Sequence, residues 1–306
     1  MQNKFGFYSG VYDLEELNSG KKMYEVIEDG RAIILEAEID NELDVCIKTL
    51  CIGVAQCIEY ERRKIMLFEK MWELICNALI ENREEKGIFT YIRDDGLETK
   101  GDMKDWNECS LTSEEIVVLS RGGGAVLDLA CGFGKHLKYM KLQQNVKDVL
   151  GVEYNEKIAQ YVNDCGMHVI CDDMCHFMST CNKTFDIVLI MGNSIAECGS
   201  LERVQELFDD IYRHLEMHGK VIVSYKDYQD TTSVEHKYYQ ENNRERGKYE
   251  GCVRIKLEYK GMYSEEKEMC YMDKKTLYHI LNSCGFDIEY ESKERSWHFT
   301  VWEKGC

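Results

Sequence analysis

The 306-residue sequence contains no proline, no segment in which basic residues gather and no long hydrophobic run. Its 38 lysine and arginine residues are outnumbered by 56 acidic ones, which gives a net charge of -18. Because phosphate neutralisation supplies much of the affinity for nucleic acid, this balance disfavours a nucleic-acid partner. No apolar run approaches the roughly 18 residues that cross a membrane, and the N-terminus lacks the apolar segment of a signal peptide. We therefore expect a cytoplasmic protein without a membrane partner.

The sequence also lacks any Cys-x-x-Cys pair, although it has 15 cysteines. The densest group is Cys171, Cys175, His176 and Cys181, whose spacing does not match a zinc site. We expect no metal centre and no disulfide framework. Reduced and mostly buried thiols in a reducing compartment are the simpler interpretation.

A buried strand followed by a glycine turn is the most informative segment, and it covers residues 125–135. Its apolar run is typical of a parallel strand that is covered on both faces. Gly132 and Gly134 let the backbone pass close to a bound molecule. Ala130 stands at the first turn position and no Gly-Lys-Ser/Thr follows, so the turn is not a diphosphate-binding loop.

Three further strand candidates follow at intervals of about 20 residues, and each ends in polar residues. Residues 149–153 end in Glu153, where a carboxylate can accept hydrogen bonds from both hydroxyls of a ribose. Residues 167–171 precede Asp172 and Asp173, which suit an exocyclic adenine amine. Residues 185–190 lead into a Gly-Asn-Ser sequence. Two simpler roles stay open, since Asp128 can cap the turn and Asp173 can N-cap a helix.

This series of strands, glycine turn and acidic strand ends resembles the class I S-adenosylmethionine-dependent methyltransferases. The resemblance implies a doubly wound α/β fold with a seven-stranded, mostly parallel sheet. Its final antiparallel strand would come from residues near 294–303, after a strand at 286–290 and a helix at 274–283. S-adenosylmethionine is the implied cofactor. The residues expected to bind it are Asp128, Ala130, Gly132, Gly134, Glu153, Tyr154, Asp172, Asp173, Met174, Gly192 and Asn193.

The absence of proline restricts the class of methyl acceptor. Methyltransferases that act on exocyclic amines of nucleic-acid bases resemble one another in an Asp/Asn-Pro-Pro-aromatic segment after the fourth strand. A chain without proline cannot contain that segment. Its place is taken by Gly192-Asn193-Ser194-Ile195-Ala196, which is similar to the strand exit of glycine and sarcosine N-methyltransferases. We expect a small-molecule acceptor, most often an amine, then a thiol, hydroxyl or carboxylate.

Further motifs over residues 88–303 resemble a group of bacterial class I enzymes that act on small molecules. They are the Arg-Asp-Asp-Gly turn at 93–96, the Asp-Tyr-x-x-Thr segment at 227–231 and the Asn-Arg-x-Arg-Gly segment at 243–247. Ala130 and Ala196 depart from the pattern because glycine is frequent at these positions. The group implies methyl transfer without fixing one acceptor.

A polar and aromatic insert at 226–250 separates a predicted fifth strand, 221–225, from a predicted sixth, 252–259. A long connection at this edge of a sheet favours a lid or binding loop. We expect an acceptor pocket walled by Tyr225, Tyr228, His236, Tyr239 and Arg244, although Arg244 also fits a solvated surface. His236 is the candidate base, Tyr228 the orienting hydroxyl, and Asn193 is grouped with them as catalytic.

The N-terminal part, residues 1–115, is expected to be mainly helical and to serve as a lid or a dimerisation region. A short strand is predicted at 32–35 and an amphipathic helical pair at 44–82, with a homodimer as a possible consequence. The methyltransferase domain is expected at 116–306. Two other classes stay open. One is an NAD-dependent oxidoreductase, although Ala130 and Lys135 stand where its glycine motif needs glycine. The other is a non-catalytic protein that binds S-adenosylmethionine and a partner chain.

Overall fold

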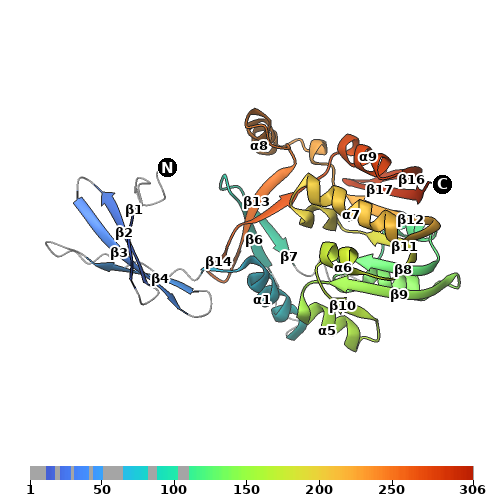
Figure 1. The fold of residues 1–306 in the computed structure, drawn as a ribbon, viewed down its shortest axis with the longest axis horizontal. Coiled ribbons are helices and arrows are strands. Elements are labelled where there is room, and N and C mark those ends of the chain that lie inside the picture. Colours follow the sequence, from blue (N-terminus) through green and yellow to red (C-terminus); the bar gives the residue numbers. More distant parts are fainter. Residues whose placement is uncertain are drawn as a thin grey trace. The chain divides into compact units, whose positions relative to one another are not determined.

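The computed structural model describes residues 12–17, 21–28, 31–40, 44–50, 65–81, 88–102 and 110–305 (Figure 1). The chain forms two compact units. One consists of residues 1–71 and 257–265, and the other of residues 72–256 and 266–306. The larger unit therefore begins well before residue 115, where the expected domain boundary lies.

The larger unit is built on a seven-stranded sheet in the order β10-β9-β8-β11-β12-β17-β16. The first five strands run parallel, and β17 is antiparallel to both of its neighbours. This confirms the predicted mixed, mostly parallel sheet. In this order the strands are Val169–Cys171, Val146–Glu153, Gly124–Leu129, Phe185–Ile190, Leu215–Tyr225, Trp297–Lys304 and Phe286–Glu294. The chain order reverses between β8 and β11, which is where open α/β sheets bind ligands.

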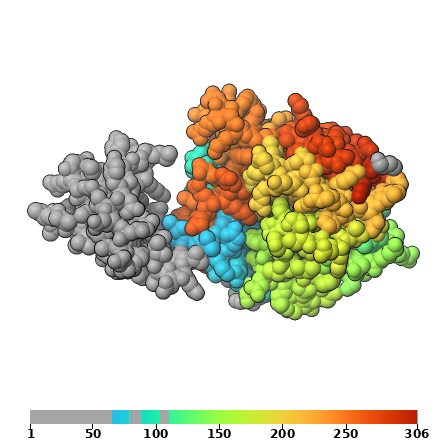
Figure 2. Space-filling model, viewed as in Figure 1, coloured from blue at the N-terminus to red at the C-terminus, as the bar shows by residue number. Residues whose placement is uncertain are grey.

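Helices cover both faces of this sheet. On one face α6 (Met174–Thr180), α7 (Leu201–His214) and α9 (Lys274–Ser283) share a buried apolar core with the strands. Side chains around α7 hide the sheet in the space-filling view (Figure 2). On the other face α4 (Lys135–Lys141) buries Leu137 and Met140. Side chains alternate along a strand, so Asp128, between core residues Leu127 and Leu129, points toward α4.

The helices begin where the sequence offers a capping side chain. Thr112 and Glu115 form a reciprocal capping box at α3 (Ser113–Leu119), and Asn155 caps α5 (Glu156–Asp164). Ser200 and Asp273 cap α7 and α9 in the same way. These caps fix the points at which the chain leaves the strands, and therefore the positions of the loops at the edge of the sheet.

A second group of strands lies outside the seven-stranded sheet. Strands β6 (Ile88–Arg93) and β7 (Glu98–Asp102) form an antiparallel hairpin, and β13 (Cys252–Tyr259) pairs with β15 (Lys267–Cys270). The prediction of 252–259 as the sixth strand of the main sheet is wrong in its placement. The hairpin of β16 and β17 fills that position, because β17 pairs with β12 from Lys220 to Tyr225.

The expected insert contains a short 3-10 helix, η2 (Tyr228–Asp230), and helix α8 (Val234–Glu245), which Ser233 caps. The predicted binding loop is therefore mainly helical. Among the described residues, no helix is both long and apolar enough to span a membrane.

The smaller unit differs most from its prediction. Its strands β1 (Tyr12–Leu17), β2 (Lys21–Glu28), β3 (Arg31–Asp40) and β4 (Asp44–Leu50) form an antiparallel sheet. The mainly helical prediction therefore fails for 12–50, although the strand expected at 32–35 lies within β3. In β4, Val45 and Ile47 repeat with the period of two that marks a strand.

The second half of the expected helical pair is present. Helix α1 (Phe68–Glu81) follows the short strand β5 (Ile65–Met66), which pairs with β14 (Met262–Ser264). Residues 51–64 of the expected pair lie outside the described residues.

Candidate functional site

The loop that leaves β8 has a left-handed backbone at three alternate positions. Ala130, Gly132 and Gly134 have φ angles of 53°, 52° and 73°. A Cβ atom on Gly134 would lie 2.9 Å from Val162 Cγ1, whereas one on Gly132 would meet no atom within 4 Å. Gly134 is therefore required for packing of the loop on α5, and Gly132 leaves open space above it.

This difference predicts that Gly134→Ala destabilises the protein more than Gly132→Ala does. At position 134 the left-handed backbone costs about 1–2 kcal/mol and the contact with Val162 about 1–3 more, so we expect a loss of about 2–5 kcal/mol. For Gly132→Ala only the backbone cost of about 1–2 kcal/mol applies. Urea denaturation measures both values. Equal losses would contradict the packing role of Gly134.

Glu153 closes the glycine loop from the end of β9. Its two carboxylate oxygens accept hydrogen bonds from the backbone N–H groups of Gly132, at 3.0 Å, and Asn155, at 2.9 Å. The side chain is buried, and burial raises the pKa of Glu153 to about 7. Each oxygen retains a further lone pair. The carboxylate is therefore held at the loop and able to accept from a ligand.

Asp128 is a buried carboxylate without a hydrogen-bond partner among the described residues. The residue is 1% exposed, and burial raises the pKa of Asp128 to about 6. The imidazole Nδ1 of His136 lies 4.0 Å away, but its Nε2 contacts Glu115 at 3.1 Å instead. A buried acceptor at the base of the glycine loop is costly unless a ligand satisfies it. The observation fits a cofactor that brings a cationic or hydrogen-bond-donating group.

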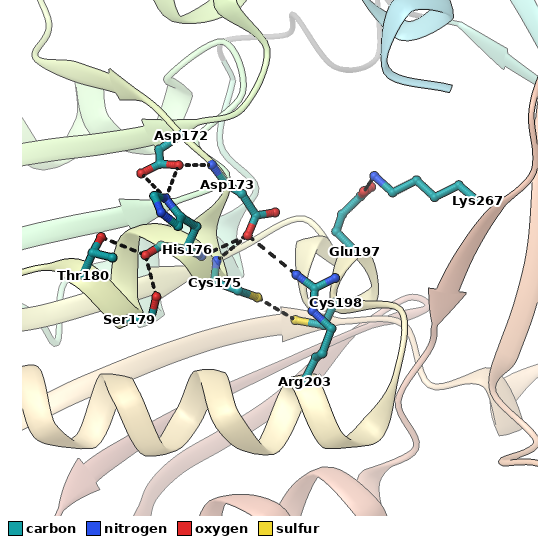
Figure 3. A network of polar contacts seen from close by, with 10 residues as sticks. All are labelled: Asp172, Asp173, Cys175, His176, Ser179, Thr180, Glu197, Cys198, Arg203 and Lys267. Atoms are coloured by element: carbon teal, nitrogen blue, oxygen red, sulfur yellow. Dashed lines mark hydrogen bonds and ion pairs between the residues drawn. The ribbon is translucent and has the colours of Figure 1, made fainter. Parts of the chain in front are cut away.

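Asp172 and Asp173 follow β10, and Figure 3 shows their contacts. Asp173 caps α6 by accepting from the N–H groups of Cys175 and His176, so the simpler role foreseen for it is present. Asp172 contacts His176 Nδ1 at 2.8 Å. Met174 is buried at the start of α6. Within the described residues no group of His, Cys, Asp or Glu side chains could hold a metal ion.

The exit of β11 is fixed to the exit of β12. Gly192 donates its N–H to Ser224 Oγ at 2.8 Å, and Asn193 Oδ1 accepts from the N–H of Lys226 at 3.0 Å. Asn193 has a left-handed backbone at φ 67°. These bonds hold the loop that faces the glycine turn, because β11 is the neighbour of β8.

The residues expected to wall the acceptor pocket have separate partners. Tyr225 is fully buried and stacks on His298, with ring centroids 5.2 Å apart. Tyr228 packs edge-on against Tyr249. The hydroxyl of Tyr239 donates to Asp94 at 2.7 Å. Each of the three tyrosines therefore contacts a residue outside the predicted pocket set.

Two of the predicted pocket residues, His236 and Arg244, lie on α8 and are exposed. Arg244 forms a bidentate pair with Glu250, at 2.7 and 2.8 Å, so its guanidinium already has a carboxylate partner. The alternative of a solvated surface fits Arg244 better than a pocket role. The pKa of the His236 imidazole is lowered. Desolvation of the ring is the larger cause, and the positive charge of Arg93 is the second.

Glu197 and Lys267 were not identified as site residues from the sequence. Glu197, in the 3-10 helix η1 (Ser194–Cys198), pairs with Lys267 of β15 at 2.5 Å (Figure 3). Lys267 also lies over the ring of Tyr154. No sequence motif could have indicated this contact, because the three residues come from distant segments.

Comparison with known proteins agrees with this geometry. Residues 126–219 match the family model of a methyltransferase domain. The structure is similar to a SAM-dependent methyltransferase from Bacteroides fragilis in complex with S-adenosyl-L-homocysteine, with a TM-score of 0.63 and 16% sequence identity. That match covers 79% of this chain and 98% of the other. Residues 126–219 therefore form a methyltransferase domain, and the chain has the fold of S-adenosylmethionine-dependent methyltransferases.

A second similar fold is a SAM-dependent methyltransferase from Methanosarcina mazei, with a TM-score of 0.51 and 14% identity. It covers 64% of this chain and 99% of the other. No curated protein matches the chain by sequence. These similarities agree with the seven-stranded sheet and with S-adenosylmethionine as the cofactor. They do not identify the methyl acceptor of this chain.

Proposed function

We propose that residues 116–306 transfer a methyl group from S-adenosylmethionine to a small-molecule amine. The observation that carries the cofactor assignment is the buried and unpartnered Asp128 carboxylate at the base of the glycine loop. The amine assignment is supported by the net charge of -18, which disfavours anionic acceptors. It is also supported by the absence of proline, which removes the segment typical of enzymes that methylate nucleic-acid bases.

The residues at the strand ends suit the parts of the cofactor. Glu153 would accept from the ribose hydroxyls and Asp172 from the adenine amine, while Gly132 allows the backbone to come close. Asp128 would offset the positive charge of the methionine part. Ala130, Gly134, Tyr154, Asp173, Met174 and Gly192 would shape the same site. When bound, S-adenosylmethionine would supply a methyl group on a positively charged sulfur. A lone pair of the acceptor can attack this methyl carbon in line, and the sulfur leaves as a neutral thioether.

The contribution of the chain is alignment and exclusion of water. Asn193 would act by fixing the β11 exit to Lys226, and Tyr228 by orienting the acceptor from η2. An amine that binds in its neutral form needs no strong base. His236 would be required only for an acceptor that must lose a proton before it attacks.

We therefore expect His236→Gln to change kcat by less than about threefold, because general base catalysis contributes only where a proton must be removed. A steady-state assay with the identified amine measures this. Lys237→Gln, next to His236 on the same helix, is the matched surface control. A loss of about 100-fold for His236→Gln alone would assign it as a base and would point to a hydroxyl acceptor.

The proposed function is tested by incubating the protein with S-adenosylmethionine carrying an isotopically labelled methyl group. Pools of small amines, thiols, alcohols and carboxylic acids serve as acceptors, and mass spectrometry detects the labelled product. Label in an amine supports the proposal. Label only in another class, or in none, contradicts it.

A further inference from the structure

One lysine side chain contacts residues that follow the two strands beside β8. Lys267 Nζ lies 2.5 Å from Glu197 Oε2 and 5.2 Å from the ring centroid of Tyr154. Glu197 follows the end of β11, and Tyr154 follows Glu153 at the end of β9. Because β9 and β11 are the two neighbours of β8, Lys267 contacts residues on both sides of the cofactor loop.

These contacts make up a cation-binding site that the chain fills with its own ammonium group. A carboxylate supplies the opposite charge, and an aromatic face attracts a cation through its quadrupole. The site is sheltered, since the side chains of Lys267 and Glu197 are 20% and 33% exposed. Partial exclusion of water strengthens the attraction between such charges.

The charge of Glu197 also acts on two tyrosines. Burial is the main cause that raises the pKa of Tyr91 and of Tyr271, and the Glu197 charge raises both further. Tyr91 lies on β6, and Tyr271 directly follows β15. The Glu197 charge also contributes to the raised pKa of Glu153. The carboxylate of Glu197 therefore lies within electrostatic reach of two phenols and of the cofactor acid.

The same three groups occur elsewhere in a more exposed form. Lys274 pairs with Glu291 at 2.8 Å, and its Nζ lies 5.1 Å from the ring centroid of Tyr278. Here the charged side chains are 49% and 51% exposed, so water competes for both. This second triad has the same residue types in a more exposed setting, although the Tyr278 hydroxyl also donates to Glu291.

We propose that Glu197 and Tyr154 bind an alkylammonium group of the acceptor that is separate from the neutral amine receiving the methyl group, and that Lys267 occupies this site until the acceptor displaces it. The inference rests on the proposed function and names its substrate class as an amine that carries a second, protonated amino group. Exchange of one ammonium group for another leaves Glu197 paired in both states. A carboxylate or phosphate acceptor would meet Glu197 as a like charge and would be rejected.

The test removes the ammonium group of Lys267 and supplies a small alkylammonium ion in its place. Lys267→Ala, saturated with S-adenosylhomocysteine, is titrated with n-propylammonium in a calorimeter, with 1-propanol as the uncharged control. We expect saturable binding at least about tenfold tighter than in the wild type, as for a sheltered charge-assisted contact. Adding Glu197→Gln to this variant should abolish binding. Lys274→Ala should not bind n-propylammonium.

The outcomes separate the two proposals. Binding of S-adenosylhomocysteine without binding of n-propylammonium to Lys267→Ala overturns only this inference. Equal binding by Lys274→Ala, or by 1-propanol, overturns it as well. Failure of the wild type to bind S-adenosylhomocysteine removes the proposed function and the inference together.

A second readout uses the wild-type protein and covers the case in which Lys267→Ala does not fold. Tetramethylammonium, which cannot be acetylated, should displace Lys267 and increase its acetylation relative to Lys274. Peptide mass spectrometry measures the ratio. An unchanged ratio at saturating tetramethylammonium contradicts the displacement.

Discussion

Asp128→Asn is expected to weaken the binding of S-adenosylhomocysteine by roughly 10- to 150-fold, since a hydrogen bond to a charged group contributes about 1.5–3 kcal/mol. The same variant should be at least as stable as the wild type without ligand. Asp128 is buried and has no hydrogen-bond partner among the described residues, so its charge costs free energy until the cofactor binds.

The expected change in stability of Asp128→Asn follows from the pKa of Asp128. Burial raises the pKa of Asp128 to about 6 from an ordinary value of 3.8, which corresponds to a cost of about 3 kcal/mol above pH 6. The folded protein holds this proton more tightly than the unfolded chain, so this cost appears as the pH rises from about 4 to 6. Burying an asparagine amide instead costs about 1–3 kcal/mol. The expected change in stability is therefore between zero and a gain of about 2 kcal/mol.

Calorimetry measures the affinity, and urea denaturation measures the stability. Asp186→Asn is the matched control, because Asp186 at the start of β11 accepts at 2.7 Å from the N–H of Ala125, at the end of β8 away from the glycine loop. It should leave the affinity unchanged. Loss of stability without loss of affinity in Asp128→Asn would show that Asp128 has a purely structural role.

The affinity for S-adenosylhomocysteine should rise about tenfold between pH 6 and pH 8, and Glu153→Gln should remove most of this rise. Burial raises the pKa of Glu153 to about 7, so about a tenth of the protein carries the ionised carboxylate at pH 6 and most of it at pH 8. Ribose hydroxyls donate to the ionised form. Ligand binding therefore releases a proton, and its affinity increases with pH in this window.

Stability without ligand should change in the opposite direction. The pKa of Glu153 lies above its ordinary value of 4.5, so the folded state binds more protons than the unfolded state between about pH 4.5 and 7. Its contribution to stability falls as the pH rises through this window. Calorimetric titrations at pH 6, 7 and 8 and constant ionic strength measure the affinity. A flat profile, or an unchanged slope in Glu153→Gln, would contradict this role.

The sequence predicted the bounds of helices, strands and turns correctly where these depend on residues close together in the chain. The strand 185–190 and the helix 274–283 have the predicted bounds, because each is an apolar pattern between clear start and stop residues. The glycine loop and the acidic ends of β9 and β10 were placed correctly for the same reason. Strand ends and turns depend on neighbouring residues, which a sequence shows directly.

Placement in space was less predictable. The strand 252–259 has the predicted bounds but pairs outside the main sheet, because strand partners are chosen by tertiary contacts that a sequence does not show. Arg244 was expected to hold an acceptor, and its partner is Glu250, six residues along the chain. The contact between Lys267 and Glu197 joins segments 70 residues apart and has no motif.

The most direct test of the cofactor is calorimetric titration of the purified protein with S-adenosylhomocysteine and, separately, with NAD. The glycine loop, the buried Asp128 and the buried Glu153 that closes the loop predict micromolar binding of S-adenosylhomocysteine and no binding of NAD. Binding of NAD alone, or of neither ligand, would contradict the assignment of the site and would leave the fold without its proposed chemistry.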